Sequence, residues 1–195
     1  MKTVEDDPEF DTKKANKKLR WYVESHDHAI RQKAEIMVDH FHNQVIGRRK
    51  IGGQARAMVI CSGIARAIQY YHAISAYLKE RKSPYQAIVA FSGEYNDGGR
   101  QVAEGSLNQF PSSQIEKKIQ QDPYRFLIVA DKFQTGYDEP LLHTMYVDKL
   151  LSGIKAVQTL SRLNRARPQK TDTFVLDFMR SEERRVGKEC RSRWS

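Results

Sequence analysis

The chain has 195 residues, a formal net charge of +9 and 39% hydrophobic residues. This length fits one globular domain with additional segments, whose core needs no disulfides or structural metal. The two cysteines, Cys61 and Cys190, exclude a disulfide framework, and no apolar run approaches the roughly 20 residues that span a bilayer. We therefore expect a soluble, cytoplasmic protein that does not bind membranes. The basic charge permits nucleic-acid binding without establishing it.

The first 54 residues are predicted to form an N-terminal linker and helical segment. Residues 1–12 are acidic and polar, and residues 13–20 are rich in lysine. Apolar side chains then recur every three or four residues, which predicts an amphipathic helix. They are Ile30, Ala34, Met37, Phe41 and Val45. The basic, glycine-containing segment 47–54 predicts the loop that ends this helix.

Residues 55–179 alternate between short apolar runs and helical patterns. The runs cover residues 57–61, 87–91, 126–130, 144–148 and 173–178. They lack the alternation of a half-exposed strand, so they predict strands covered on both faces. Helices are predicted over 64–82, over 155–166, and from a capping box of Ser113 and Glu116 to the residue before Pro123. This order predicts an α/β domain with a parallel sheet and right-handed crossovers.

The loop after the third predicted strand is rich in groups that bind nucleotides. Thr135, Gly136 and Asp138 follow directly after the apolar run 126–130. Ligands of open α/β sheets bind at the carboxyl ends of the strands. Gly136 permits a close approach of the backbone, Thr135 offers a hydroxyl and an N–H to a phosphate, and Asp138 can accept from a sugar hydroxyl.

The helix predicted over 155–166 carries the second candidate group. Gln158, Arg162 and Arg165 are spaced by four and three residues, which places them on one face of a helix. We expect the opposite face, with Ala156, Leu160 and Leu163, to pack on the sheet. Paired arginines suit a triphosphate because each planar guanidinium offers several donors. The alternative is a solvated basic helix face, and the nearby Thr-Gly-x-Asp loop favours the phosphate site.

These two segments resemble known motifs. KFQTGYDEP resembles motif V of superfamily 2 helicases and translocases, and QTLSRLNRARP resembles their motif VI, usually written Gln-x-x-Gly-Arg-x-x-Arg. Residues 110–178, with VAFSGE and ARAMVICSG upstream, resemble the restriction (R) subunit of type I restriction-modification enzymes. The resemblance covers roughly residues 13–179. Ser161 stands where the wider superfamily has Gly, and type I R subunits commonly have Ser there, so this position narrows the family.

The resemblance implies a function. R subunits are DNA-translocating ATPases and endonucleases whose motor holds ATP between two RecA-like lobes, and this chain resembles the second lobe. Arg162 and Arg165 would then be arginine fingers for the γ-phosphate, and Gln158 would position them. Gly136 and Asp138 would contact the nucleotide, and Thr135 and Ser62 would meet the DNA backbone. The partners implied are double-stranded DNA, the first lobe, and the modification and specificity subunits. Their positive charge makes Lys132, Arg48, Arg49 and Lys50 further candidates for DNA phosphate contacts.

Two motifs of such a motor do not occur in the sequence. There is no GxxxxGK[ST] loop to hold phosphates, and no DEAD-like acidic run to hold Mg²⁺. Both belong to the first lobe in the family that the chain resembles. ATP and Mg²⁺ are therefore expected to bind mainly there, and we expect this chain to be a fragment that is inactive alone. The alternative is a stand-alone nucleic-acid-binding or interaction module without catalysis.

Two other features invite a functional interpretation. His26, His28, His40 and His42 could suggest a metal site. Residues two apart on a helix point to different sides, so solvated histidines and no metal are expected. The arginine-rich residues 180–195 resemble vector or adapter read-through, and the alternative is a basic tail that binds nucleic acid.

Overall fold

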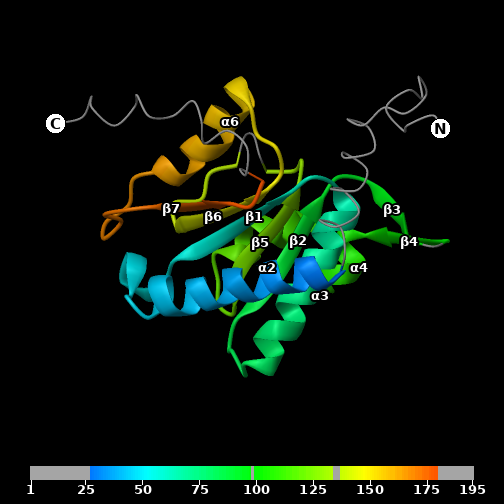
Figure 1. Ribbon diagram of the computed structural model, residues 1–195, viewed down its shortest axis with the longest axis horizontal. Helices are drawn as coiled ribbons and strands as arrows, with labels where there is room; N and C mark the ends of the chain where they lie inside the picture. The colour runs from blue at the N-terminus through cyan, green and yellow to red at the C-terminus, as the bar shows by residue number, and fades with distance from the viewer. Residues whose placement is uncertain (1–26, 98, 134–136, 180–195) are drawn as a thin grey trace, which may run out of the picture.

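A five-stranded parallel sheet lies at the centre of the computed structural model, which describes residues 27–97, 99–133 and 137–179 (Figure 1). The strand order is β2-β5-β1-β6-β7, and each neighbouring pair is parallel. The five strands are β1 (Arg56–Cys61), β2 (Gln86–Phe91), β5 (Tyr124–Ala130), β6 (Leu142–Asp148) and β7 (Phe174–Asp177). Each contains or overlaps one of the apolar runs, so the predicted parallel α/β fold is confirmed.

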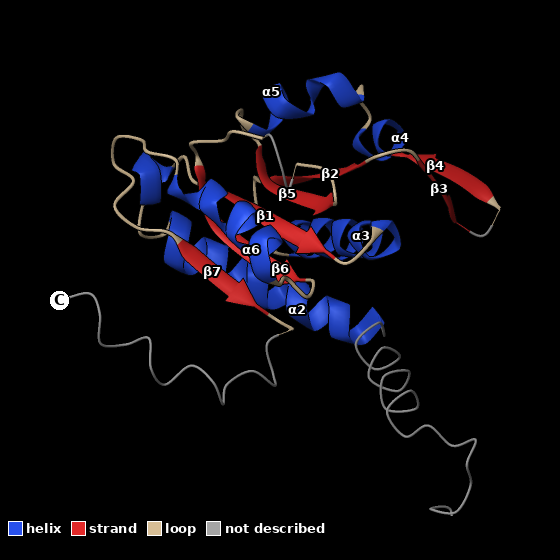
Figure 2. Ribbon diagram, turned by 90° about the horizontal axis from the view of Figure 1, so that it is seen from above, coloured by secondary structure: helices blue, strands red, loops and turns tan. Residues whose placement is uncertain are grey.

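The helices cover both faces of this sheet. They are α2 (Asp27–His40), α3 (Ile64–Glu80), α4 (Glu104–Asn108), α5 (Ile115–Ile119) and α6 (Gly153–Leu160), with a π-helical turn η2 (Phe41–Ile46) and 3₁₀ turns η3 (Lys50–Gly53), η4 (Ser112–Gln114) and η5 (Ser161–Asn164). Helices α2 and α3 lie on one face and α5 lies on the other (Figure 2). Every residue of β1 is buried, which explains why its sequence does not alternate. None of the helices in the described residues is long and apolar enough to cross a membrane.

The helix predicted around residues 30–45 is present and belongs to the same core as the sheet. Its buried side chains, including Ile30, Met37 and Phe41, pack in one cluster with Val59 of β1 and Tyr146 of β6. The ring of Phe41 lies 4.7 Å from that of Phe126 on β5. The boundary predicted at residue 54 therefore falls inside one packed unit.

The edge strand β2 is protected by side chains from α4. Asn108 Oδ1 accepts a hydrogen bond from the Val89 N–H at 2.9 Å, and Asn108 Nδ2 donates to the Val89 carbonyl at 2.7 Å. Glu104 Oε2 accepts from the Phe91 N–H at 2.8 Å. An amide and a carboxylate thus take the place of a neighbouring strand and close an edge that could otherwise pair with another chain.

One local prediction was wrong. Ser113 does not cap a helix, because η4 begins after Pro111 and α5 begins after Gln114, with no side-chain cap at either start. The antiparallel pair β3 (Glu94–Asp97) and β4 (Arg100–Ala103), which projects beyond the end of β2, was not predicted (Figures 1 and 2).

Candidate functional site

The two motif segments meet in space. The guanidinium of Arg162 in η5 donates a hydrogen bond to the carbonyl oxygen of Tyr137, in the loop between β5 and β6. Arg165 Nε lies 3.1 Å from Asp138 Oδ1. Thr135 and Gly136 fall outside the described residues, and their roles stay predictions. The described part of the loop and the arginine segment form one contiguous surface.

Buried side chains hold this surface in place. Leu163 is 2% exposed and Tyr137 is 5% exposed, and both belong to the second core on the α5 side of the sheet. The Tyr137 ring packs 4.8 Å from that of Phe133. The Tyr137 hydroxyl donates to Glu139 Oε2 at 3.3 Å. The backbone on both sides of the contact is thus anchored, while the Arg165 side chain remains 52% exposed.

Arg162 and Arg165 both reach the loop after β5, but they do not do so from one face of a helix. Helix α6 ends at Leu160, η5 follows, and Arg165 has extended backbone angles. Gln158 is exposed on α6 and its carbonyl oxygen accepts a hydrogen bond from Ser161 Oγ at 3.0 Å. The prediction that Gln158, Arg162 and Arg165 share one helix face is therefore wrong. Leu163 is buried against the sheet as predicted, and Ala156 and Leu160 are half-buried.

The candidate DNA contacts lie at opposite ends of the parallel strands. Ser62 is exposed just after β1, at the carboxyl ends of the strands. Arg48, Arg49 and Lys50 precede β1, and Lys50 Nζ pairs with Asp172 Oδ2 at 2.6 Å. Six residues of strand, about 20 Å, separate the two groups. One track along a single edge of the sheet cannot contact both.

Lys132 is engaged inside the protein. Its ammonium forms an ion pair with Glu104, whose side chain is 6% exposed, and it lies 5.3 Å from the centre of the Phe133 ring. Glu104 is the carboxylate that also accepts from the Phe91 N–H. Lys132 therefore neutralises the buried Glu104 carboxylate, so a contact of Lys132 with DNA would have to leave this ion pair intact.

A buried carboxylate that sequence reasoning missed lies at the end of β6. Asp148 is 1% exposed, and its oxygens lie 2.7 Å from Lys33 Nζ and 3.2 Å from Arg66 Nη1. The Tyr70 hydroxyl donates to Asp148 Oδ2 at 2.9 Å. Burial, and then the Asp148 charge, raise the pKa of Tyr70 and that of the adjacent Cys61 thiol. This cluster joins α2, α3 and β6, and Cys61 beside it is a buried free thiol.

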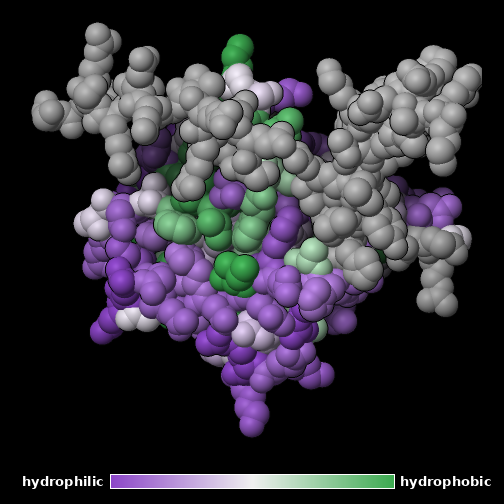
Figure 3. Space-filling model, in the orientation of Figure 1, coloured by the Kyte–Doolittle hydropathy of each residue, from purple (hydrophilic) through white to green (hydrophobic). Residues whose placement is uncertain are grey.

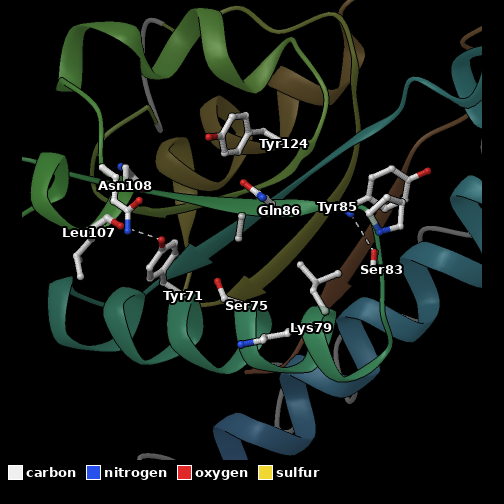
Figure 4. A pocket seen from close by; sticks show the side chains of 13 residues that line it. Tyr71, Ser75, Lys79, Ser83, Tyr85, Gln86, Leu107, Asn108 and Tyr124 are labelled. Carbon is white, nitrogen blue, oxygen red and sulfur yellow. Dashed lines mark hydrogen bonds between the residues drawn. The ribbon is translucent and has the colours of Figure 1, made fainter.

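A cavity of about 410 Å³ opens beside the start of β2, between α3 and α4 (Figure 4). Its walls carry the aromatic rings of Tyr71, Tyr85 and Tyr124 with polar groups of Gln86 and Asn108. The Tyr71 hydroxyl donates to the Leu107 carbonyl at 2.9 Å, and burial raises the Tyr71 pKa. No motif in the sequence pointed to this cavity, because its walls come from separate elements.

Two of the four histidines, His40 and His42, are half-buried, contrary to the prediction, whereas His28 is exposed as predicted. His26 lies outside the described residues. The His40 ring stacks 4.1 Å from that of Phe174, and His40 Nδ1 lies 2.8 Å from the Tyr146 hydroxyl oxygen. His42 Nε2 lies 3.0 Å from Ser83 Oγ. Burial lowers the pKa of both histidines. Within the described ranges, no three His, Cys, Asp or Glu side chains are grouped so that they could hold a metal ion.

Apolar side chains gather on the outer surface of α6 and β7. Leu150, Ile154, Val157 and Val175 are all exposed, and Ile154 is 76% exposed. Figure 3 shows hydrophobic residues over these elements, whereas the lower part of the same view is hydrophilic. Large apolar side chains that are exposed close together in a chain are typical of an interaction site.

Comparisons with known proteins agree on one family. Residues 94–180 match the model of domain 3 of the type I restriction enzyme subunit R. The chain is 26% identical over 136 residues to a putative type I restriction enzyme MjaVIIP endonuclease subunit of Methanocaldococcus jannaschii, covering 63% of this chain and 13% of that protein. It is 27% identical over 117 residues to the HindI endonuclease subunit of Haemophilus influenzae, covering 49% and 11% respectively. The chain thus spans about an eighth of the length of these relatives.

A solved structure supports the fold. The crystal structure of T4 UvsW superposes with a TM-score of 0.52 at 15% identity, over 87% of this chain and 28% of that chain. At this level of identity the likeness concerns the fold alone. Together with the five-stranded parallel sheet flanked by helices, it confirms the RecA-like α/β architecture.

Proposed function

Because the chain is related to the endonuclease subunits of type I restriction enzymes, we propose that it contributes the second RecA-like lobe of an ATP-driven motor that moves along double-stranded DNA. The observation that carries this proposal is the contact of Arg165 with Asp138, beside that of Arg162 with Tyr137. It joins the two segments that a nucleotide would touch in such a lobe. The sequence patterns alone could not establish that these segments meet.

The proposed role of Arg165 is to reach the γ-phosphate of ATP. The Arg165–Asp138 pair is exposed on both sides, at 52% and 62%, so it contributes about 0–1 kcal/mol and is easily exchanged. A phosphate can therefore displace Asp138, whose carboxylate then accepts from a sugar hydroxyl. Arg162 is held against the Tyr137 carbonyl, and we propose that it fixes the loop and faces the same phosphates. Gln158, exposed one turn away, is proposed to orient the arginine segment.

The described residues do not fit a Mg²⁺ site, since they hold no group of three potential metal ligands. The sequence also has no phosphate-binding GxxxxGK[ST] loop. We therefore assign the phosphate cradle and Mg²⁺ to a first lobe. The exposed apolar side chains of α6, Ile154 and Val157, next to the arginines, are the surface proposed to pack against it.

DNA is proposed to cross the edge of the sheet where the strands end. Ser62 is exposed there, and Thr135, which follows β5 in the sequence, is proposed as a second contact. Hydroxyl groups at this edge suit phosphate contacts, which hold a duplex without reading its sequence. The modification and specificity subunits of the restriction complex are the further partners that this proposal implies. A module that binds nucleic acid without ATP hydrolysis is the alternative.

Steady-state ATP turnover by the intact subunit tests the proposal. Arg165→Ala should reduce DNA-stimulated turnover by about three orders of magnitude, as the loss of an arginine finger does. Lys155→Ala, which removes a positive charge from the exposed side of α6, serves as the matched control and should leave turnover unchanged. Near-normal turnover of Arg165→Ala would show that this arginine is not a finger and would favour the binding-module alternative.

A further inference from the structure

A groove runs across the amino-terminal ends of the parallel strands, opposite the ends that carry Ser62. It consists of two cavities of about 410 and 450 Å³, which share Gln54, Pro140 and Arg167. The first cavity extends to Arg56 and Arg125, the second to the loops around Ile51 and Gln169. The walls come from the segments that precede β1, β5, β6 and β7.

Positive charge exceeds negative charge around this groove. Arg56, Arg125 and Arg167 line it, whereas its carboxylates are Asp122 and Glu139. Both carboxylates are engaged. Asp122 Oδ1 lies 2.7 Å from Arg125 Nη2 and 3.4 Å from Arg56 Nη2. Glu139 accepts from the Leu141 N–H at 2.9 Å and from the Tyr137 hydroxyl.

Arg167 has a neutral partner. Its Nη2 donates to the side-chain oxygen of Gln54 at 3.1 Å, and no carboxylate of the described residues forms an ion pair with it. Burial, and then the neighbouring Arg125 charge, lower the pKa of Arg56 to about 10. The arginine cluster therefore has fewer negative charges than it can accommodate.

Two buried donors near this groove have no acceptor. Across the described ranges, the buried side-chain nitrogen and oxygen atoms without a hydrogen-bond partner are Arg125 Nε and Lys170 Nζ. Lys170 directly follows Gln169 in the groove wall and lies within electrostatic range of Glu139 and Asp138. An unpaired buried donor costs about 1–3 kcal/mol, so two of them here call for an explanation. Both are nitrogens that donate, which indicates a missing acceptor.

The loop beside the groove has a strained backbone. Arg49 and Ile51 have positive φ angles of 53° and 50°, which a β-branched residue such as Ile51 rarely adopts. Such strain costs about 1–3 kcal/mol per residue and persists where the surroundings impose it, often at functional sites. The loop presents the exposed side chains of Arg48 and Arg49 next to the second cavity.

We propose that this groove binds the phosphates of a nucleic-acid backbone, with Arg167 as the central contact and Arg48 and Arg49 extending it. Arginine suits phosphate because its planar fork donates two parallel hydrogen bonds. None of the residues lining either cavity is aromatic, so the groove offers no ring on which a base could stack. This favours backbone contacts over a bound nucleotide. The site lies at the opposite edge from the proposed ATP and DNA contacts, and it does not depend on them.

Fluorescence anisotropy of a labelled 30-base-pair duplex with the full 195-residue chain tests the proposal. Arg167→Ala should weaken binding about 3- to 10-fold and reduce the slope of log K against log salt by about one. Removing Arg48, Arg49 and Arg167 together should reduce that slope by about three. Lys155→Ala is the control of equal charge, on α6, and should change affinity less than twofold. The basic residues 180–195 contribute equally to all of these variants.

A second variant separates binding from folding. Arg167→Gln removes the charge of the central contact but keeps a side chain that can hydrogen-bond, so it should leave the thermal unfolding midpoint nearly unchanged while weakening the duplex complex. Unlabelled duplex should compete for the groove, whereas ATP and poly-glutamate at equal charge concentration should not. Unchanged affinity in the triple variant, an equal loss in Lys155→Ala, or equal competition by ATP or poly-glutamate would each overturn the proposal.

Discussion

Arg165 Nε and Asp138 Oδ1 lie 3.1 Å apart and join the turn after α6 to the loop after β5. Both side chains are more than half exposed, so this ion pair adds little to stability. The ion pair matters for geometry instead, because it places the Arg165 guanidinium against the loop that follows β5. That relationship gives the proposed nucleotide site its geometry.

Replacing Arg165 should therefore leave folding almost unchanged. We expect Arg165→Ala to alter the free energy of unfolding by less than about 1 kcal/mol, since an exposed ion pair contributes about that at most. Urea unfolding followed by circular dichroism measures this directly. A loss of several kcal/mol would mean that the residue is structural, and a loss of ATP turnover could then not be assigned to chemistry.

Asp148 should behave in the opposite way. Asp148→Ala leaves Lys33 and Arg66 without their shared carboxylate at a buried site, and we expect a destabilisation of about 3–5 kcal/mol. Asp131→Ala is the control, because Asp131 is 76% exposed and also pairs with a lysine. Its cost should stay below about 1 kcal/mol. Equal urea midpoints for the two variants would contradict the assigned role of Asp148.

Asn108 should matter for both stability and solubility. Asn108→Ala removes both hydrogen bonds to Val89 and leaves a buried N–H and carbonyl unpaired, which should cost about 1–3 kcal/mol for each. The exposed edge of β2 should also promote association through strand pairing. Ser106→Ala, on the exposed side of α4, is the control. Light scattering during unfolding should rise for Asn108→Ala alone, and a monomeric variant of normal stability would contradict the edge-protection argument.

Stability should fall as the pH drops below about 6.5, the ordinary pKa of histidine. Burial lowers the pKa of His40, His42 and His143 in the folded chain. The unfolded chain therefore binds more protons in this range, so acidification favours unfolding. The Tyr146 hydroxyl donates its hydrogen to the Met37 carbonyl. In the contact between His40 and Tyr146, the donor is therefore His40 Nδ1. Thermal unfolding measured from pH 7.5 to 5.5 should show a falling midpoint. His40→Phe should make the midpoint depend less on pH. A midpoint of the unchanged chain that stays constant over this range would contradict the prediction.

The sequence predicted the sheet well, because strands buried on both faces leave continuous apolar runs such as residues 57–61 and 126–130. It predicted α2 and α3 from their apolar spacing. The short elements were harder to predict, since α4 has one turn and is defined by its contacts with β2. The pairing of β1 between β5 and β6 depends on contacts between distant segments, which a local pattern does not contain.

The two segments named from the sequence meet in the structure, and the roles of Arg162 and Asp138 stay predictions. The helix-face argument failed because the chain leaves the helix after Leu160 and turns through η5. Asp148 and the groove at Arg167 were missed for a common reason. Each is assembled from residues of three or more elements, and neither has a sequence spacing that marks it.

The arginine-finger role is best measured as DNA translocation by the intact subunit, monitored by displacement of a third strand at saturating ATP. In Arg165→Ala we expect translocation and ATP turnover to fall together by about three orders of magnitude, while the dissociation constant for ATP changes far less. Lys155→Ala should match the unchanged subunit in all three measurements. Translocation at a normal rate by Arg165→Ala would contradict the assignment of this chain as the arginine-finger lobe of the motor.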